Sequence, residues 1–154
     1  MIESLSVDWK VFVNVYMENG KVIKVEFSKY PVEEVVSSET AENLKKDLER
    51  YFRGIKVDFR KYDVHLSVSP FVKSVLDFVR TIPYGKVLTY GQIAKILNTS
   101  PRAVGMALRL NPIPIIIPCH RVVSKNGLGG FSAGVWIKRE LLRLEGTTFL
   151  SQLL

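Results

Sequence analysis

A short segment of the chain, IPCHRVV at residues 117–123, contains the residue types that thiol chemistry needs. Cys119 is the only cysteine of the chain, and His120 is one of two histidines. A cysteine reacts as its thiolate, and a nearby histidine commonly serves as the base that removes the thiol proton. The basic residues Arg121 and Lys125 also favour the thiolate, so its pKa is expected to lie below the usual ~8.5. The segment therefore predicts a nucleophilic cysteine.

A buried and unreactive cysteine is the alternative interpretation. Free cysteines often behave as small apolar residues, and the apolar run before Cys119 favours burial. Neighbouring side chains of an extended strand point to opposite faces, so contact between Cys119 and His120 requires a local bend or a bridging water molecule. Glu145 is the candidate that orients the histidine, because a carboxylate at the end of a predicted helix opposes the helix dipole and needs a partner. A solvated glutamate is the alternative there.

Prolines and glycines indicate how the cysteine is held. Pro112, Pro114 and Pro118 exclude a helix and predict a stiff, extended chain up to the cysteine. Glycines between residues 127 and 134 predict a loop that can approach a ligand closely. A final helix is expected over roughly 134–145. Its expected inward-facing residues are Ile137, Leu141 and Leu144, with Trp136 beside them.

Three further helices are predicted upstream of this segment. Ser69, Thr89 and Ser100 are good N-caps for the first, second and third of them. Only three residues join the second helix to the third, which is typical of a helix-turn-helix unit whose second helix contacts DNA. Arg102 lies in the first turn of that helix. The inward-facing residues expected in the first two helices are Phe71, Val75, Phe78, Val79, Ile93, Ile96 and Leu97.

Basic and acidic residues are distributed unevenly along the chain. Residues 1–69 contain 11 basic and 12 acidic side chains, whereas residues 70–154 contain 11 basic and three acidic ones, a net charge of +8. Such an excess in one half is typical of a surface that binds phosphates. Nucleic acid is favoured over a membrane surface, because no basic amphipathic anchor helix is present. Solubility alone is the other interpretation of this charge.

The first 65 residues predict a small α+β lobe without a catalytic group. Asn19-Gly20 separates two alternating apolar runs, which predicts a β-hairpin with a type I′ turn. A helix is expected from the cap Ser38 to the stop signal Gly54, and His65 is isolated. The segments with strand character are residues 11–17, 21–28, 57–59 and 64–68.

The composition narrows the class of protein. Apolar residues make up 47% and charged residues 24%, which is typical of a globular protein with one domain or two small lobes. No apolar run reaches the ~18–20 residues that span a bilayer, and no leader is evident, so a soluble cytoplasmic protein is expected. One cysteine cannot form an internal disulfide or, with two histidines, a cysteine-rich zinc site.

Four segments closely resemble the O6-alkylguanine-DNA alkyltransferases, which are the methylated-DNA–protein-cysteine methyltransferases. The segments are IPYGKVLTYGQIA (82–94), NPIPIIIPCHRVV (111–123), GGFSAG (129–134) and LLRLEG (141–146). The resemblance spans roughly residues 69–147 and implies an α+β fold in two domains. Residues 1–65 would form a structural domain with an antiparallel sheet and a helix, similar to RNase H. Residues 66–154 would form a mostly helical domain with a winged-helix-like helix-turn-helix.

The resemblance implies repair of DNA by direct reversal of damage. The alkyl group on O6 of guanine would pass irreversibly to Cys119 in a single turnover, after the nucleotide is flipped out of the duplex. O4-alkylthymine is left open as a second substrate. The resemblance implies double-stranded DNA containing O6-alkylguanine as the partner, a monomeric protein, and neither a cofactor nor a metal ion.

The resemblance also assigns roles to residues of this chain. Cys119 would accept the alkyl group, His120 would take its proton through a water molecule, and Glu145 would orient the histidine. Asn111 would brace the cysteine segment, and Tyr90 would donate a hydrogen bond to N3 of guanine.

Further residues would contact the substrate or the DNA. Arg102 would fill the gap left by the flipped nucleotide, the carbonyls of Cys119 and Val122 would accept from the guanine amino group, and the amide of Ser132 would face O6. The remaining residues of this group are Phe131, Gly130, Ala103 and Arg121.

The chain departs from the family pattern at a few positions. Phe131 replaces a common tyrosine, and Ala133 replaces a common glycine. Some relatives bind structural zinc in the first lobe, but this chain has no cysteine there, so no zinc is predicted. Two other functions stay open: a helix-turn-helix regulator whose cysteine is incidental or senses alkylation, and a thiol hydrolase that uses Cys119 and His120.

Overall fold

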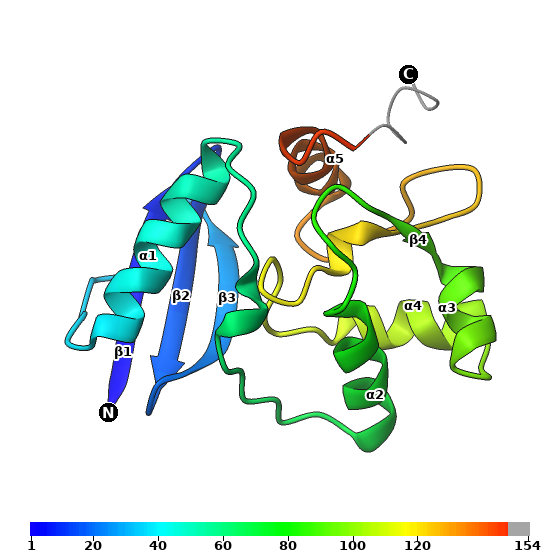
Figure 1. Cartoon of the computed structure of the whole chain (residues 1–154), viewed down its shortest axis with the longest axis horizontal. Helices are drawn as coiled ribbons and strands as arrows, with labels where there is room; N and C mark the ends of the chain where they lie inside the picture. Colours follow the sequence, from blue (N-terminus) through cyan, green and yellow to red (C-terminus); the bar gives the residue numbers. More distant parts are fainter. Residues whose placement is uncertain (148–154) are drawn as a thin grey trace. The chain divides into compact units, whose positions relative to one another are not determined.

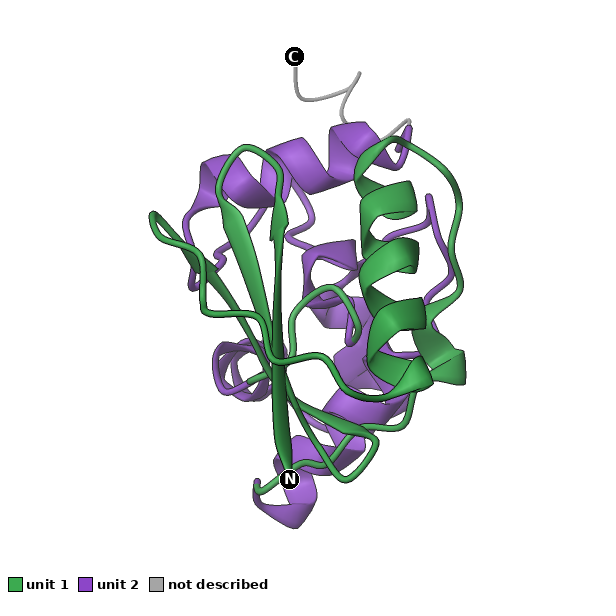
Figure 2. Cartoon of the chain, turned by 90° about the vertical axis from the view of Figure 1, so that its left-hand side faces the viewer, with its two compact units in different colours: residues 1–67, 112–116 green, residues 68–111, 117–154 purple. Residues whose placement is uncertain are grey.

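The computed structural model describes residues 1–147, which form two compact units (Figures 1 and 2). Unit 1 comprises residues 1–67 and 112–116, and unit 2 comprises, among the described residues, 68–111 and 117–147. Unit 1 has a small antiparallel sheet and unit 2 is mostly helical, so the expected α+β class is confirmed. Among the described residues, no helix is long and apolar enough to cross a membrane.

The sheet of unit 1 is a meander of three antiparallel strands in the order β1-β2-β3. They are β1 (Ile2–Asp8), β2 (Phe12–Glu18) and β3 (Lys21–Ser28). Asn19 and Gly20 join β2 to β3 with φ values of 51° and 79°, which confirms the predicted hairpin. Strand β1 was not expected; it pairs along the whole length of β2 and buries Leu5 and Val7.

Helix α1 (Glu39–Phe52) packs against the sheet of unit 1 (Figure 1). The hydroxyl of Ser38 accepts a hydrogen bond from the amide of Ala41, as expected of an N-cap. Gly54 follows the helix with a φ of 85°, which confirms the predicted stop signal. The fully buried residues that α1 contributes to the core are Ala41, Leu44, Leu48 and Tyr51.

The strands predicted at 57–59 and 64–68 do not form. The carboxylate of Asp58 accepts from the amide of Arg60 and starts the 3-10 turn η1 (Phe59–Lys61), which ends the extended chain. Val64 makes only an isolated parallel bridge with Val22. Strand character in a run of three to five residues is therefore not enough by itself to form a strand.

Unit 2 is built from helices that begin at the predicted caps. They are α2 (Pro70–Val79), α3 (Tyr90–Ile96), α4 (Pro101–Arg109) and α5 (Val135–Leu144). The hydroxyls of Ser69, Thr89 and Ser100 each accept from a backbone amide of the first turn, which confirms all three caps. Helix α4 packs against both α2 and α3.

A short parallel pairing was not predicted, yet it determines where the site lies. Strand β4 (Leu88–Thr89) pairs with β5 (Val122–Val123), and both are only two residues long. Because β4 leads directly into α3 and β5 directly follows residues 119–121, the pairing places the start of α3 beside the cysteine segment.

Some helix faces differ from the predicted ones. Helix α2 buries Val72, Val75, Leu76 and Val79, so its inner face is turned by about one residue from the expected one. Of the residues expected to face inward, Phe78, Leu97 and Leu144 are half-buried. Those that are exposed are Phe71, Ile96 and Trp136. In each short helix, two overlapping apolar stripes were possible, and the packing partners selected between them.

Truncation of the core of unit 1 tests this packing. Leu48→Ala should lower the free energy of unfolding by ~2–5 kcal/mol, because Leu48 is 0% exposed and its removal leaves a cavity. Glu49→Ala, at the exposed neighbouring position, should change it by less than ~0.5 kcal/mol. Urea denaturation of both variants measures the difference, and equal stabilities would contradict the described core.

Candidate active site

Cys119 lies in a tight 3-10 turn, η2 (Cys119–Arg121), and not in an extended strand. Its amide donates to the carbonyl of Ile117 at 2.8 Å, and the amide of Arg121 donates to that of Pro118 at 3.0 Å. The prediction of an extended chain is therefore wrong at this point. The turn supplies the local bend that contact between neighbouring side chains would require, and it buries Cys119 and His120 together.

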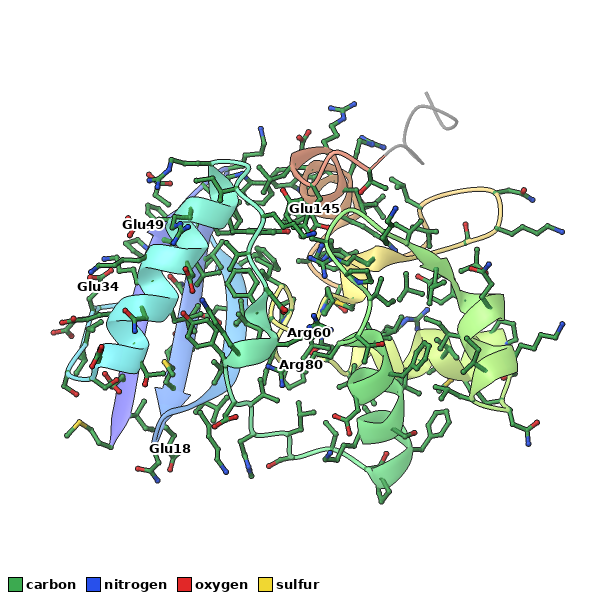
Figure 3. The ribbon with its side chains drawn as sticks, viewed as in Figure 1. Glu18, Glu34, Glu49, Arg60, Arg80 and Glu145 are labelled. Carbon is green, nitrogen blue, oxygen red and sulfur yellow. The ribbon has the colours of Figure 1, made fainter. Side chains whose placement is uncertain are left out.

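A buried carboxylate organises the residues around this turn. Oε2 of Glu145 lies 2.7 Å from Nε2 of His120. Arg121 donates to both oxygens of the same carboxylate, at 2.9 Å and 3.0 Å, and also to the carbonyl of Ile82 at 2.7 Å. The amide of Gly85 donates to Oε1 at 3.2 Å. Glu145 caps the C-terminal end of α5 (Figure 3) and is 5% exposed, which excludes a solvated glutamate.

The charges around Glu145 determine its ionisation. Burial alone would raise its pKa, but the interactions with His120 and Arg121 outweigh burial and hold the pKa well below the usual range. The carboxylate is therefore ionised at every pH at which the protein would work. A bidentate guanidinium contact is geometrically specific, so it also fixes the orientation of the carboxylate.

His120 is fully buried and neutral at pH 7. Burial lowers its pKa, and this effect exceeds the opposing attraction of Glu145. In the neutral ring, the proton belongs on Nε2, where Glu145 accepts it, so Nδ1 carries the lone pair. Nδ1 has no hydrogen-bond partner among the described residues. The ring is thus held as a base with its free nitrogen available.

The thiol of Cys119 is less acidic than its sequence neighbours suggested. Burial raises its pKa, and hydrogen bonding from Asn111 and the positive charge of Lys138 oppose this only in part. The expected lowering of the pKa by Arg121 and Lys125 is wrong. Arg121 is committed to Glu145, and Lys125 is exposed. Cys119 is therefore a thiol at neutral pH and needs a base to become a nucleophile.

Two further expected residues lie beside the cysteine. The side-chain amide of Asn111 donates from Nδ2 to the carbonyl of Ile117 at 3.0 Å, and the same side chain also interacts with the thiol. Tyr90 is the first residue of α3, and burial raises the pKa of its hydroxyl, which stays protonated at neutral pH. A Cβ atom on Gly129 would lie 2.6 Å from that hydroxyl, so only glycine lets the loop pack against Tyr90.

Lys138 belongs to the site and was missed by sequence reasoning. It is completely buried on α5, and its ammonium donates to the carbonyl of Gly130 at 3.0 Å and to the hydroxyl of Tyr90 at 3.4 Å. Burial lowers the pKa of Lys138 to about 8. The available signal was its position next to Ile137 and three residues before Leu141, on the apolar stripe of the helix.

The residues expected to contact DNA are distributed over α4 and the 127–134 loop. Arg102 is exposed in the first turn of α4, and Ala103 next to it is half-buried. In the loop, Ser132 is exposed and Phe131 is half-buried. Gly130 is exposed and Val122 is buried in β5. Arg121 does not fit this group, because its buried guanidinium binds Glu145, and its expected role in binding DNA is corrected.

No group of three or more potential metal ligands occurs among residues 1–147. The arrangement that does occur is a buried thiol, a neutral histidine with a free nitrogen, and an ionised carboxylate fixed by an arginine. This is the composition of a nucleophilic site in which a base activates the thiol and a third group orients the base.

Comparison with known proteins agrees with the motif resemblance. Residues 70–147 match the family model described as 6-O-methylguanine DNA methyltransferase, DNA binding domain. A methylated-DNA–protein-cysteine methyltransferase of Archaeoglobus fulgidus is 49% identical over 148 residues, which cover 92% of this chain and 97% of that protein.

Solved structures are similar over nearly the whole length. The crystal structure of the Mycobacterium tuberculosis O6-methylguanine methyltransferase has a TM-score of 0.80 and 28% identity, covering 94% of this chain and 93% of that one. The structure of Mycobacterium tuberculosis OGT in complex with DNA has a TM-score of 0.78 and 27% identity, covering 93% and 92%. Taken with the thiol site, these matches confirm the resemblance: the chain belongs to the methylated-DNA–protein-cysteine methyltransferase family.

Proposed function

We propose that this protein repairs DNA by transferring the alkyl group from O6 of guanine to its own Cys119. The observation that carries the proposal is the buried Cys119–His120–Glu145 arrangement. It occurs in a chain that is 49% identical to a methylated-DNA–protein-cysteine methyltransferase. Alkyl transfer from an ether oxygen needs an activated thiol and no cofactor. Double-stranded DNA containing O6-alkylguanine is the proposed substrate, and a monomer in the cytoplasm is the proposed working form.

The first step is activation of the thiol. Because burial keeps Cys119 protonated, His120 would take its proton through a water molecule at Nδ1. The imidazolium that forms is stabilised by the ionised carboxylate of Glu145, 2.7 Å from Nε2. Arg121 keeps that carboxylate charged and oriented, so its role in the reaction is to position Glu145.

In the second step, the thiolate displaces the guanine oxygen. The sulfur forms a bond to the alkyl carbon while the bond from that carbon to O6 breaks, and the electron pair moves onto the base. Tyr90, whose hydroxyl is protonated, would donate a hydrogen bond to N3 and stabilise that charge. The guanine takes up one proton, which balances the proton released by the thiol. The thioether that remains on Cys119 is not hydrolysed, so each molecule reacts once.

The alkylated base must leave the duplex before it can reach a buried sulfur. Extrusion of a nucleotide costs a few kcal/mol, and less when the base pairs poorly. Arg102 in the first turn of α4 is the residue proposed to fill the resulting gap, and small Ala103 beside it allows close approach of the DNA backbone. The base would then lie beside Tyr90 and the 127–134 loop, and Gly130, Phe131 and Ser132 of that loop are proposed to contact it.

Backbone groups would complete recognition of the guanine. The carbonyls of Cys119 and Val122 are proposed to accept from its amino group, and the amide of Ser132 to face O6. Asn111 supports this by fixing the carbonyl of Ile117 two residues before the cysteine. O4-alkylthymine, which presents an analogous alkyl ether, is a second substrate to be tested.

The two units would divide the work. Unit 2 contains all the residues assigned to chemistry and DNA binding, and unit 1 contributes none. We propose an RNase H-like arrangement for the sheet and helix of unit 1, and a winged-helix-like arrangement around α3 and α4 in unit 2.

Intact-protein mass measurement tests the proposed reaction. Incubation with one equivalent of duplex DNA carrying O6-methylguanine should add a single methyl group, located on Cys119. Cys119→Ala should abolish the transfer and keep the affinity for DNA. Repeated turnover of an ester would indicate a thiol hydrolase, and sequence-specific binding without a change in mass would indicate a regulator.

Removal of the Arg102 side chain in α4 tests the extrusion step. Arg102→Ala should slow methyl transfer from duplex DNA on the order of tenfold, because the gap is no longer filled and the flipped state loses part of the few kcal/mol it needs. Transfer from the free base should be nearly unchanged. Lys56→Ala, which removes an exposed cation from unit 1, is the control. If Arg102→Ala transfers methyl from duplex DNA at the wild-type rate, the proposed role of α4 in base extrusion is wrong.

A pair of glycine variants tests the placement of Tyr90. Gly129→Ala should reduce the transfer rate strongly, because its φ of 76° disfavours a side chain and its Cβ would collide with the phenol. Gly91→Ala in α3 would place its Cβ no closer than 3.9 Å to another side chain, at a backbone conformation that alanine tolerates, so it should react at nearly the wild-type rate. Single-turnover kinetics on the same duplex compare the two variants. Similar losses of transfer rate in both would contradict the proposed placement of Tyr90.

A further inference from the structure

Lys138 is a buried cation that the proposed reaction does not use. It is 0% exposed, and no carboxylate pairs with it among residues 1–147. Its hydrogen-bond acceptors are neutral: the carbonyl of Gly130 at 3.0 Å and the hydroxyl of Tyr90 at 3.4 Å, with the ring centroid of Tyr90 at 5.6 Å. Lysine is rarely buried without a counter-ion, because the ammonium loses its hydration. An anion close to Lys138 would therefore stabilise its buried ammonium.

The surroundings of Lys138 contain one group that can supply this anion. The ionisable groups of the site are Cys119 on η2, Tyr90 on α3, Arg109 on α4 and the His120–Arg121–Glu145 network. In that network the carboxylate of Glu145 is already neutralised by its own partners. Tyr90 stays protonated at neutral pH. Among these protein groups, only Cys119 becomes negatively charged during the proposed reaction, and a thiolate there would be attracted by the charge of Lys138.

We propose that Lys138 is a positioning residue whose buried ammonium is the counter-ion of the thiolate formed at Cys119. Its hydrogen bonds to Gly130 and Tyr90 anchor the charge between the loop and the start of α3. The inference rests on the proposed role of Cys119 as the alkyl acceptor.

The charges explain why the site needs this cation. Proton transfer from Cys119 to His120 separates a thiolate from an imidazolium in a buried place, and Glu145 stabilises only the imidazolium. Lys138 lowers the free energy of the thiolate, which Glu145 does not stabilise. Burial opposes both charged forms, raising the pKa of Cys119 and lowering that of Lys138 to about 8, and their mutual attraction acts against both shifts. Transfer of the alkyl group then converts the thiolate to a neutral thioether.

The pH dependence of thiol reactivity tests the proposal without DNA. The rate of Cys119 alkylation by iodoacetamide would be measured from pH 6 to 10 for the wild type and for Lys138→Met, which keeps the length of the side chain and removes its charge. Lys138→Met should react about tenfold more slowly near pH 7.5, with a profile displaced upward by about one pH unit. Lys138→Arg should recover part of the difference.

The direction of the change separates an electrostatic effect from a folding defect. An unfolded variant exposes Cys119, which would make the thiol react faster and bring its pKa toward the usual value. Lys125→Gln removes the same charge from an exposed position and should keep the wild-type profile. A Lys138→Met profile that coincides with that of the wild type, or one that is faster, overturns the proposal.

The same proteins separate this inference from the proposed function. If the profile of Lys138→Met shifts but the wild type takes no methyl group from O6-methylguanine DNA, the counter-ion assignment stands and the alkyl-transfer assignment falls. If the wild type is methylated on Cys119 and the two profiles coincide, the function stands and the role of Lys138 falls.

Discussion

The ionised carboxylate of Glu145 is the constraint on which the site depends. It lies at the C-terminal end of α5, where the helix dipole disfavours a negative charge, and it is buried away from solvent. Two hydrogen bonds from Arg121, one from Gly85 and one from His120 compensate for this. Because Arg121 also binds the carbonyl of Ile82, the carboxylate connects α5, the cysteine turn and the segment before β4. Loss of this one charge would remove the hydrogen bonds that connect these three segments of unit 2.

Much of the fold could be predicted because its signals are local. The hairpin at Asn19-Gly20 follows from backbone conformations that few residues tolerate, and the helix starts at Ser38, Thr89 and Ser100 follow from side chains that bind their own first turn. Strand β1 and the β4–β5 pair could not be predicted in this way. Their residues form strands only because a partner edge is present, and the partner of β5 lies more than thirty residues earlier in the chain.

The residues of the site were predictable, whereas their electrostatics were not. Cys119, His120 and Glu145 could be named from residue types, motif and position. The pKa of Cys119 was predicted in the wrong direction, because sequence proximity suggested that Arg121 would act on the sulfur. In the structure that guanidinium is committed to a carboxylate 24 residues away, and the cation whose charge opposes the rise in the pKa of Cys119 is Lys138. Charge effects depend on distance and burial, and neither quantity is visible in the order of residues.

The discontinuity of unit 1 has a consequence for how such a protein can be divided. Residues 112–116 belong to unit 1, where the amide of Val25 donates to the carbonyl of Pro112, although both flanking segments belong to unit 2. The chain therefore leaves unit 2 after Asn111 and returns at Ile117, two residues before the cysteine. No single cut in the gene yields both units whole, and a fragment starting at residue 68 would carry the otherwise buried Ile113, Ile115 and Ile116 without the unit to which they belong. Recombination can exchange unit 1 between relatives only if residues 112–116 are exchanged together with residues 1–67.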